Sequence, residues 1–198
     1  MMKIKNKNVK NNIDSGAISL FEAGIWITIS LIVLVIGISI GGGLFSRNDT
    51  NTELSNISEL MNNSRTLLKT NGTYNFEGGE SMIGALIQFG GVPGNMSIIG
   101  DKSSGKAHLQ NVWGGAVSVE PAADSAGELT GFHLIYQMVP QEACIAIAQR
   151  LSTTSFVHAI RINDTINRGS ISAGNLGGQC VADSGEHKGN ILSFISDN

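Results

Sequence analysis

The dominant feature of the hydropathy pattern is an apolar run near the N-terminus. Glu22 is followed by 24 residues, 23–46, that carry no charge and are mostly Ile, Leu and Val. Runs of 18 or more such residues are typical of transmembrane helices, whereas cleaved secretory signals have only 7–15. Inserting about 13 Ile, Leu, Val and Phe residues at roughly −0.5 kcal/mol each favours the membrane by on the order of 6 kcal/mol. The pattern therefore predicts a membrane-spanning segment over residues 18–46.

A second helical pattern follows at once. Apolar residues recur at spacings of three and four between residues 52 and 69, namely Leu54, Ile57, Leu60, Met61, Leu67 and Leu68. This spacing predicts an amphipathic helix over residues 47–71, and Asn71-Gly72 is a usual stop signal. A continuous helix over residues 18–70 would be about 80 Å long, and the three glycines 41–43 would be its weakest point.

The pattern of the remaining residues, 72–198, predicts one α+β body. Residues 72–115 are rich in Gly, which indicates a long loop with one short helix. Alternating or β-branched stretches predict strands over residues 116–120, 132–138, 156–163 and 191–196. Between them, residues 140–151 have helical spacing, with Cys144 on the apolar face. This order of elements favours an antiparallel sheet with helices.

Charge is divided unevenly along the chain. The 198 residues carry a net −3, but residues 1–17 hold four lysines and only Asp14, a local +3, so the remaining 181 residues carry −6. Lysines before an apolar run keep the N-terminus cytoplasmic, so the body is expected to be exported. The acidic body argues against nucleic acid as a partner. With 41% hydrophobic and 15% charged residues, the chain is also not a disordered one.

The residues before the apolar run resemble the processing site of type IV prepilins. The segment is Ala17-Ile18-Ser19-Leu20-Phe21-Glu22. The resemblance implies cleavage between Ala17 and Ile18, methylation of the Ile18 amino group, and contact between Glu22 and the amino terminus of a neighbouring subunit. The sequence differs from the family at Ala17, where nearly all members have Gly. The basic leader, residues 1–17, is similar in length to type IVb leaders.

The body is similar to the thin-pilus, conjugative-type major pilins of the type IVb group. The similar residues are Gly72-x-Tyr74-x-Phe76, Leu86-Ile87, Gly91-Val92-Pro93, Met96, Val112-Trp113-Gly114-Gly115 and Ala143-Cys144-x-x-Ile147-Ala148. The resemblance implies the type IV pilin fold, a long N-terminal helix packed on an antiparallel sheet with a C-terminal disulfide region. Cys144 and Cys180 are expected to pair because an exported body meets an oxidising compartment; two buried free thiols would be expected in the cytosol.

Motifs of catalysis are weak in this chain. Residues 100–107 nearly match a phosphate-binding loop, but Ala107 replaces the hydroxyl residue that holds Mg²⁺. Ser103 and Lys106 have the spacing of Ser-Lys hydrolases without the companion motifs. The four histidines, His108, His133, His158 and His187, lack the spacing of a metal site. We therefore expect no catalytic, metal or cofactor residue and no enzymatic activity.

These observations predict the major structural subunit of a type IVb pilus from a Gram-negative bacterium. By resemblance, its partners are other copies of the chain, a prepilin peptidase, the inner-membrane assembly machinery and a host or recipient cell surface. The precursor would lie in the inner membrane and the mature subunit in an extracellular filament for adhesion, aggregation or conjugation. A minor pilin, a type II secretion pseudopilin, and a single-pass membrane protein with an exported binding or enzymatic domain are the alternatives.

Overall fold

The computed structural model describes residues 47–183 and 189–197. The chain divides into two compact units, Met1–Phe45 and Ser46–Asn198, and the described residues belong to the second. The expected leader and membrane segment, with Ala17, Ile18 and Glu22, lie outside the described residues, as does His187. None of the helices in the described ranges is both long enough and apolar enough to cross a membrane.

A long helix, here the spine helix, covers residues 47–67. Ile57, Leu60 and Met61 form its buried face, as the three- and four-residue spacing predicts. The helix ends at Leu67, earlier than the expected Asn71. Residues 70–73 instead form a turn closed by the Thr70–Thr73 bridge, in which Asn71 and Gly72 adopt positive φ. Leu67, expected on the apolar face, is 40% exposed because it lies in the last turn, beyond the sheet-facing stripe.

One sheet of seven strands packs against the spine helix. Its spatial order is β1-β2-β3-β4-β7-β5-β6, and every neighbouring pair is antiparallel. The C-terminal strand is therefore inserted between β4 and β5. The strands are β1 Ser97–Ile99, β2 His108–Gln110, β3 Ala116–Ala122, β4 Gly131–Val139, β5 Ala159–Ile162, β6 Thr165–Arg168 and β7 Asn190–Ser196.

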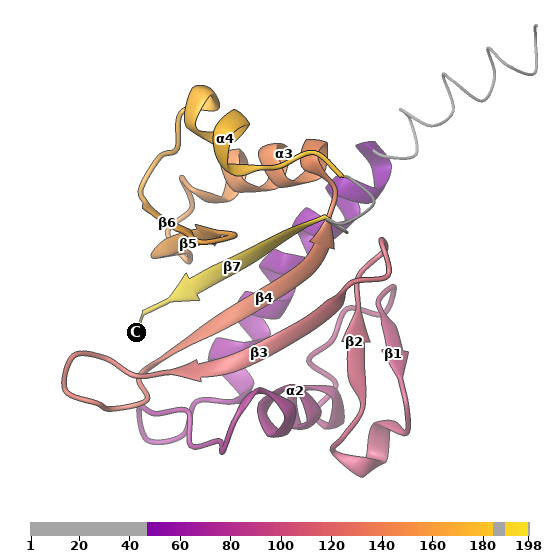
Figure 1. Cartoon of the computed structure of the whole chain (residues 1–198). Coiled ribbons are helices and arrows are strands. Elements are labelled where there is room, and N and C mark those ends of the chain that lie inside the picture. Colours follow the sequence, from indigo (N-terminus) through magenta and orange to yellow (C-terminus); the bar gives the residue numbers. More distant parts are fainter. Residues whose placement is uncertain (1–46, 184–188, 198) are drawn as a thin grey trace, which may run out of the picture. The chain divides into compact units, whose positions relative to one another are not determined.

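Residues 68–183 contain three further α-helices and a short 3₁₀-helix. They are α2 Gly79–Gln88, α3 Gln141–Leu151, α4 Ala173–Gln179 and the 3₁₀-helix Lys102–Ser104. In Figure 1 the spine helix crosses behind the sheet, α2 lies beside β3 at one end, and α3 and α4 lie at the other end.

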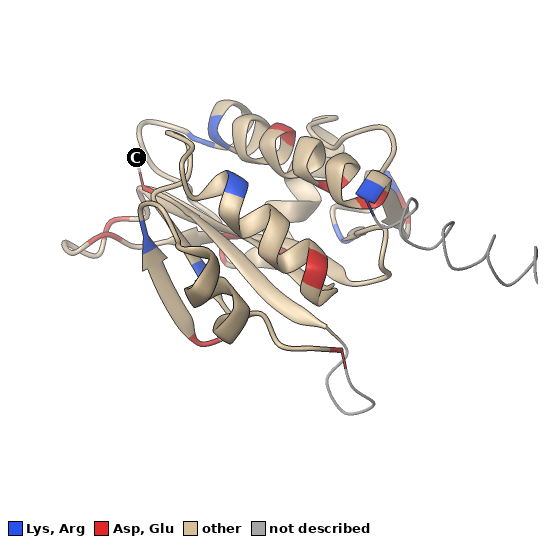
Figure 2. Ribbon diagram, turned by 90° about the horizontal axis from the view of Figure 1, so that it is seen from above, with Lys and Arg blue, Asp and Glu red and all other residues tan. Residues whose placement is uncertain are grey.

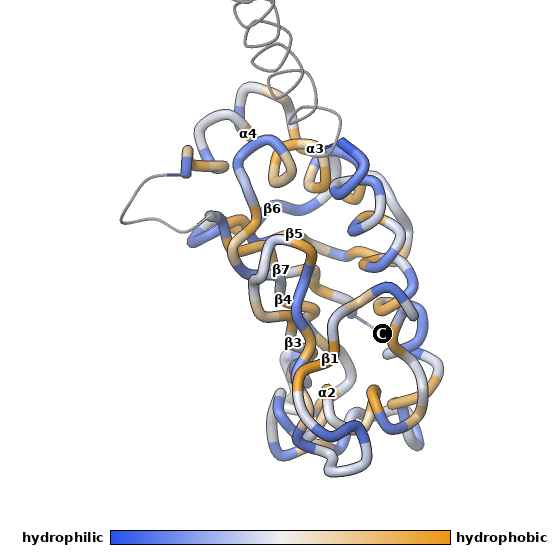
Figure 3. The backbone as a smooth tube through the Cα atoms, turned by 90° about the vertical axis from the view of Figure 1, so that its right-hand side faces the viewer, coloured by the Kyte–Doolittle hydropathy of each residue, from blue (hydrophilic) through white to orange (hydrophobic). Residues whose placement is uncertain are grey.

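The core lies between the sheet and the helices. Alternate residues of the central strand β4, Phe132, Leu134 and Tyr136, are fully buried, and Leu192 and Phe194 of β7 continue the same face. The intervening side chains point to the opposite face, as strand geometry requires. Figure 3 shows apolar and polar stretches of the backbone interspersed in both the strands and the helices.

The expected fold class, four strand regions and α3 are confirmed, and four details differ. Strand β6 was not expected, and it pairs with β5 directly after the turn at Asn163 and Asp164. The stretch expected as loop also contains β1 and β2, which are three residues each. The glycine-rich link before β7 contains α4, which begins where the Ser172 hydroxyl accepts a hydrogen bond from the Asn175 N–H and which buries Leu176. His158 precedes β5 instead of lying in a strand, because the chain first makes the turns of residues 152–156.

Candidate functional site

The disulfide region is the most constrained part of the head. Cys144 lies on the buried face of α3 and is bonded to Cys180, the residue directly after α4, with 5.9 Å between their Cα atoms. Both residues are fully buried. Closing a loop across a sequence separation of 36 stabilises the fold by about 4 kcal/mol on the chain-entropy estimate. The expected pairing is therefore present, and it holds α3 and α4 together.

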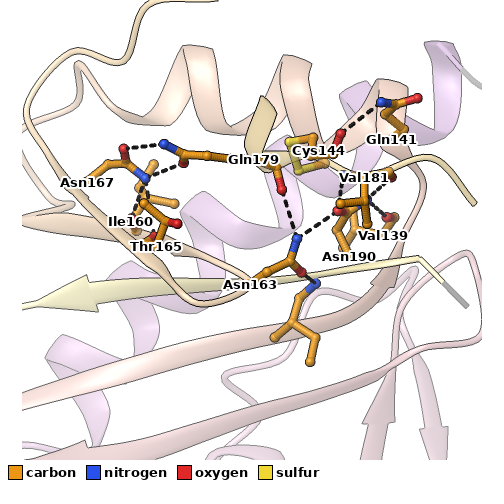
Figure 4. The surroundings of a disulfide bond; sticks show 12 residues. Val139, Gln141, Cys144, Ile160, Asn163, Thr165, Asn167, Gln179, Val181 and Asn190 are labelled. Carbon is orange, nitrogen blue, oxygen red and sulfur yellow. Dashed lines mark hydrogen bonds between the residues drawn. A yellow bond between two sulfur atoms is a disulfide. The ribbon is translucent and has the colours of Figure 1, made fainter. Parts of the chain in front are cut away.

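Asn190, the first residue of β7, is fully buried beside this disulfide (Figure 4). Its Nδ2 group donates to the carbonyls of Val139 at 3.1 Å and Val181 at 3.0 Å. Its Oδ1 atom accepts from the Val181 N–H at 2.8 Å and from Asn163 Nδ2 at 3.0 Å. One amide thus ties three segments together, and all of its common hydrogen-bonding positions are used.

A second set of amides joins the β5–β6 hairpin to α4. Asn163, at the hairpin turn with φ of 50°, donates to the Gln179 carbonyl at 2.9 Å and accepts from the Ile191 N–H at 3.0 Å. Asn167 and Gln179 exchange two side-chain hydrogen bonds of 2.7 and 3.0 Å. Gln141 donates to the Cys180 carbonyl at 2.8 Å. Because amides neither ionise nor act as nucleophiles at neutral pH, this arrangement positions segments and does no chemistry.

A buried carboxylate, that of Glu53, connects the spine helix to the turn after β2. Glu53 is 2% exposed; its Oε1 atom accepts from the Val112 N–H at 2.7 Å and its Oε2 atom accepts from Asn56 Nδ2 at 3.1 Å. Burial raises the pKa of Glu53, and the hydrogen bonds from Val112 and Asn56 oppose that shift.

The Tyr136 hydroxyl is buried near this carboxylate. It makes no hydrogen bond of good geometry, although it is close enough to Glu53 for the two groups to interact electrostatically. Burial, and then the charge of Glu53, raise the pKa of Tyr136 far above its ordinary range. The Tyr136 phenol therefore stays neutral. None of the groups that shift the pKa of Glu53 is a cation.

The weak enzyme motifs form ordinary surface structure. Asp101 accepts a hydrogen bond from the Ser103 N–H at 2.9 Å and caps the 3₁₀-helix between β1 and β2, so no α-helix opens there as a phosphate-binding loop requires. Ser103 and Lys106 are both exposed. Within residues 47–183 and 189–197, no three His, Cys, Asp or Glu side chains gather into a group that could hold a metal ion.

The sequence identifies the two cysteines as site residues but does not single out Glu53, Asn163 and Asn190. Glu53 looks like one more polar position of an amphipathic helix, and the two asparagines do not stand out in an asparagine-rich chain. The Gly189-Asn190 pair before an apolar run was the one available signal, since it marks a turn entering a strand.

Two solved structures share this head. A crystal structure of type IVb pilin from Salmonella typhi matches with a TM-score of 0.65 and 33% identity, over 75% of this chain and 99% of that chain. An NMR structure of the type IVb pilin PilS from the same organism matches with a TM-score of 0.52 and 32% identity, over 76% and 97%. The antiparallel sheet, the helices and the disulfide region therefore define a type IVb pilin.

The family follows from the sequence. A family model described as PilS N terminal matches residues 47–196. The chain therefore belongs to the PilS N-terminal family of type IVb pilins. No curated protein matches the chain.

Proposed function

We propose that this chain is the major structural subunit of a type IVb pilus that serves adhesion, aggregation or conjugative mating. One observation carries the proposal: the head shares its fold and 33% of its residues with a type IVb pilin over 99% of that chain. Subunits of this class assemble with copies of themselves, so the expected product is an extracellular filament.

The N-terminal residues supply the processing and the assembly steps of this proposal. The four lysines of residues 1–17 keep the leader cytoplasmic while residues 18–46 span the inner membrane. A prepilin peptidase cuts between Ala17 and Ile18 and methylates the new amino terminus. The assembly machinery then moves residues 18–46 from lipid into the filament, where neighbouring helices cover the same apolar surface.

Glu22 sets the register in this scheme. A carboxylate at the edge of hydrocarbon is costly unless it is paired. The Ile18 amino group of the adjacent subunit provides the pair, and the low dielectric strengthens their attraction. If neighbouring helices packed in another register, the Glu22 carboxylate and the Ile18 amino group would be buried without partners. That register is therefore disfavoured.

The test compares two variants of the full chain in cells that make the pilus. Glu22→Ala is expected to insert in the membrane normally but to lower sheared filament yield at least about tenfold, the effect of losing about 1.4 kcal/mol of subunit interaction. Glu59→Ala, at an exposed position of the spine helix, is the matched control and should assemble like wild type. Normal filament yield from Glu22→Ala would refute the role of Glu22.

Mass spectrometry of sheared filaments tests the subunit assignment itself. The dominant protein should begin at methylated Ile18. A chain that retains Met1 would indicate a single-pass membrane protein, and a trace amount within filaments built from another protein would indicate a minor pilin or pseudopilin.

A further inference from the structure

One face of the sheet is not covered by the helices that form the core. On β4, β7, β5 and β6 the side chains that alternate with the buried set point away from the spine helix. One row across this open face runs His133, Ile195, Ala159 and Arg168, as the strand register shows. Arg161 lies in the next row on the same face.

A hollow of about 600 Å³ lies between this face and the loop that joins β3 to β4. Its basic residues are His133, Arg161 and Arg168, and Ile195 contributes an apolar surface. The loop adds small and hydroxyl-bearing residues, including Ser125 and Thr130. Hollows of 300–1,000 Å³ are the usual size of sites for small ligands.

The two arginines have no partner within the described part of the chain. Both are exposed, and neither guanidinium group makes a hydrogen bond or an ion pair there. They are diagonal neighbours on adjacent strands, a separation of about 7–8 Å between backbone positions. Two like charges this close repel each other, so an anion between them would be stabilised.

The two acidic residues that line the hollow, Asp124 and Asp197, already have partners in the chain. Asp124 accepts hydrogen bonds from the N–H groups of Ala126 at 2.8 Å and Glu128 at 3.0 Å, which lower its pKa. Asp197 lies 3.1 Å from His158 Nε2. Most of the ribbon carries neither acidic nor basic residues (Figure 2), and residues 18–198 carry a net −6, so two neighbouring arginines without a partner stand out.

We propose that this hollow binds an acidic saccharide, with Arg161 and Arg168 holding its carboxylate or sulfate groups. The planar guanidinium fork matches such groups with two parallel hydrogen bonds each. Ile195 offers a surface for the C–H face of a sugar ring, and Ser125 offers a hydroxyl to its polar edge. The Thr130 hydroxyl donates to Asp124 Oδ2 at 3.3 Å, so it can accept a hydrogen bond from a sugar hydroxyl. Burial, and then the nearby Arg161, lower the pKa of His133, while its cross-strand neighbour Glu120 and Asp197 oppose that shift. The lowered pKa favours the uncharged imidazole at neutral pH, which can serve as a hydrogen-bonding group.

The site adds a ligand to the proposed pilus subunit and rests on that proposal only for its exposure at the cell surface. The experiment therefore uses the full chain in detergent, where binding does not depend on polymerisation. Its probes are heparin, which is sulfated, and polygalacturonate, which is carboxylated, with neutral dextran as the reference. If the chain binds the probes but forms no filaments in cells, the proposed subunit role is wrong and the site stands. If it forms filaments but does not bind the probes, the site is wrong and the subunit role stands.

The decisive comparison is between two charge-matched double variants. Arg161→Gln with Arg168→Gln should weaken binding of heparin, polygalacturonate or both at least about tenfold, because it removes both guanidinium forks. Lys102→Gln with Lys106→Gln removes the same charge from an exposed segment and should stay within about twofold of wild type. An equal loss in both double variants would overturn the site, as would wild-type binding no stronger to either probe than to dextran.

A competitor separates saccharide recognition from a general attraction to polyanions. Polyglutamate should displace the bound saccharide poorly at matched charge concentration. Displacement as effective as that by polygalacturonate would overturn the saccharide assignment. Arg161→Lys with Arg168→Lys keeps the charge and loses the fork, so intermediate binding is expected from it.

Discussion

Replacing Asn190 by Ala should be among the most destabilising changes in the head. The side chain is fully buried and makes four hydrogen bonds to three residues, Val139, Val181 and Asn163. Alanine removes all four and leaves the partners facing a small void that offers no replacement. The disulfide stays intact in this variant, so the effect reports on the amide alone.

The expected size follows from the number of bonds lost. At a net value of about 1 kcal/mol for each hydrogen bond, four bonds amount to about 4 kcal/mol. A chain of this length changes its melting temperature by roughly 2–4 °C for each kcal/mol, so the midpoint should fall by about 8–16 °C. Asn190→Asp keeps the two acceptor contacts but turns a carboxylate toward the Val139 and Val181 carbonyls, so we expect at least as large a loss at neutral pH.

Thermal unfolding of the full chain in detergent, followed by circular dichroism without reductant, measures this effect. Asn175→Ala is the control, because Asn175 is exposed on α4 and its side chain makes no hydrogen bond within the described residues. Its midpoint should change by no more than that of an ordinary surface substitution, about 0.5 kcal/mol. If Asn190→Ala melts within about 2 °C of wild type, the reasoning about the amide is wrong.

Two other changes test the packing and the buried carboxylate. Burial raises the pKa of Glu53 above its ordinary 4.5, so wild type should lose stability as pH rises through that raised pKa. Glu53→Gln keeps an acceptor for the Val112 N–H and does not ionise, so it should lose less stability over the same range. In denaturant titrations, the free energy of unfolding of Glu53→Gln relative to wild type should therefore be higher at pH 7 than at pH 4. Equal pH dependence of the two chains would contradict the shift. Gly84→Ala should destabilise by about 1–3 kcal/mol, because its Cβ would lie against the Gly105 carbonyl, whereas Gly177→Ala in α4 meets open space and should be neutral or stabilising by up to about 1 kcal/mol. Similar thermal midpoints for these two glycine variants would argue against the close packing of α2.

The sequence predicts those elements of the head that bury a regular apolar pattern. Apolar and polar residues alternate along strands β3, β4 and β7, and apolar residues recur every three and four positions along α3. In each of these elements the pattern predicts which face is buried. Strands β1 and β2 have three residues each, too few for a period to show. Helix α4 contains three glycines in seven residues and forms only because Ser172 caps it and Leu176 and Cys180 bury its inner side. Tertiary packing therefore decides these elements against local propensity.

The same distinction applies to the candidate site. The cysteines could be paired from the sequence because export implies an oxidising compartment, and only two cysteines are available. Asn190 and Glu53 gave no such signal, since their partners are mostly backbone groups, and backbone groups look alike at every position. Arg161 and Arg168 could not be related to each other until the β5–β6 pairing placed both on the open face.

Asn190, Glu53 and the Cys144–Cys180 disulfide share a physical role. Asn190 reaches Val139 across 51 residues, Glu53 reaches Val112 across 59, and the disulfide spans 36. Each fixes a segment that has few large apolar side chains and therefore gains little from burial. Polar and covalent contacts of this kind are directional. They therefore fix the position of a glycine-rich loop in addition to stabilising it. Asn163, at the turn between the strands that carry Arg161 and Arg168, is one of the groups that Asn190 holds.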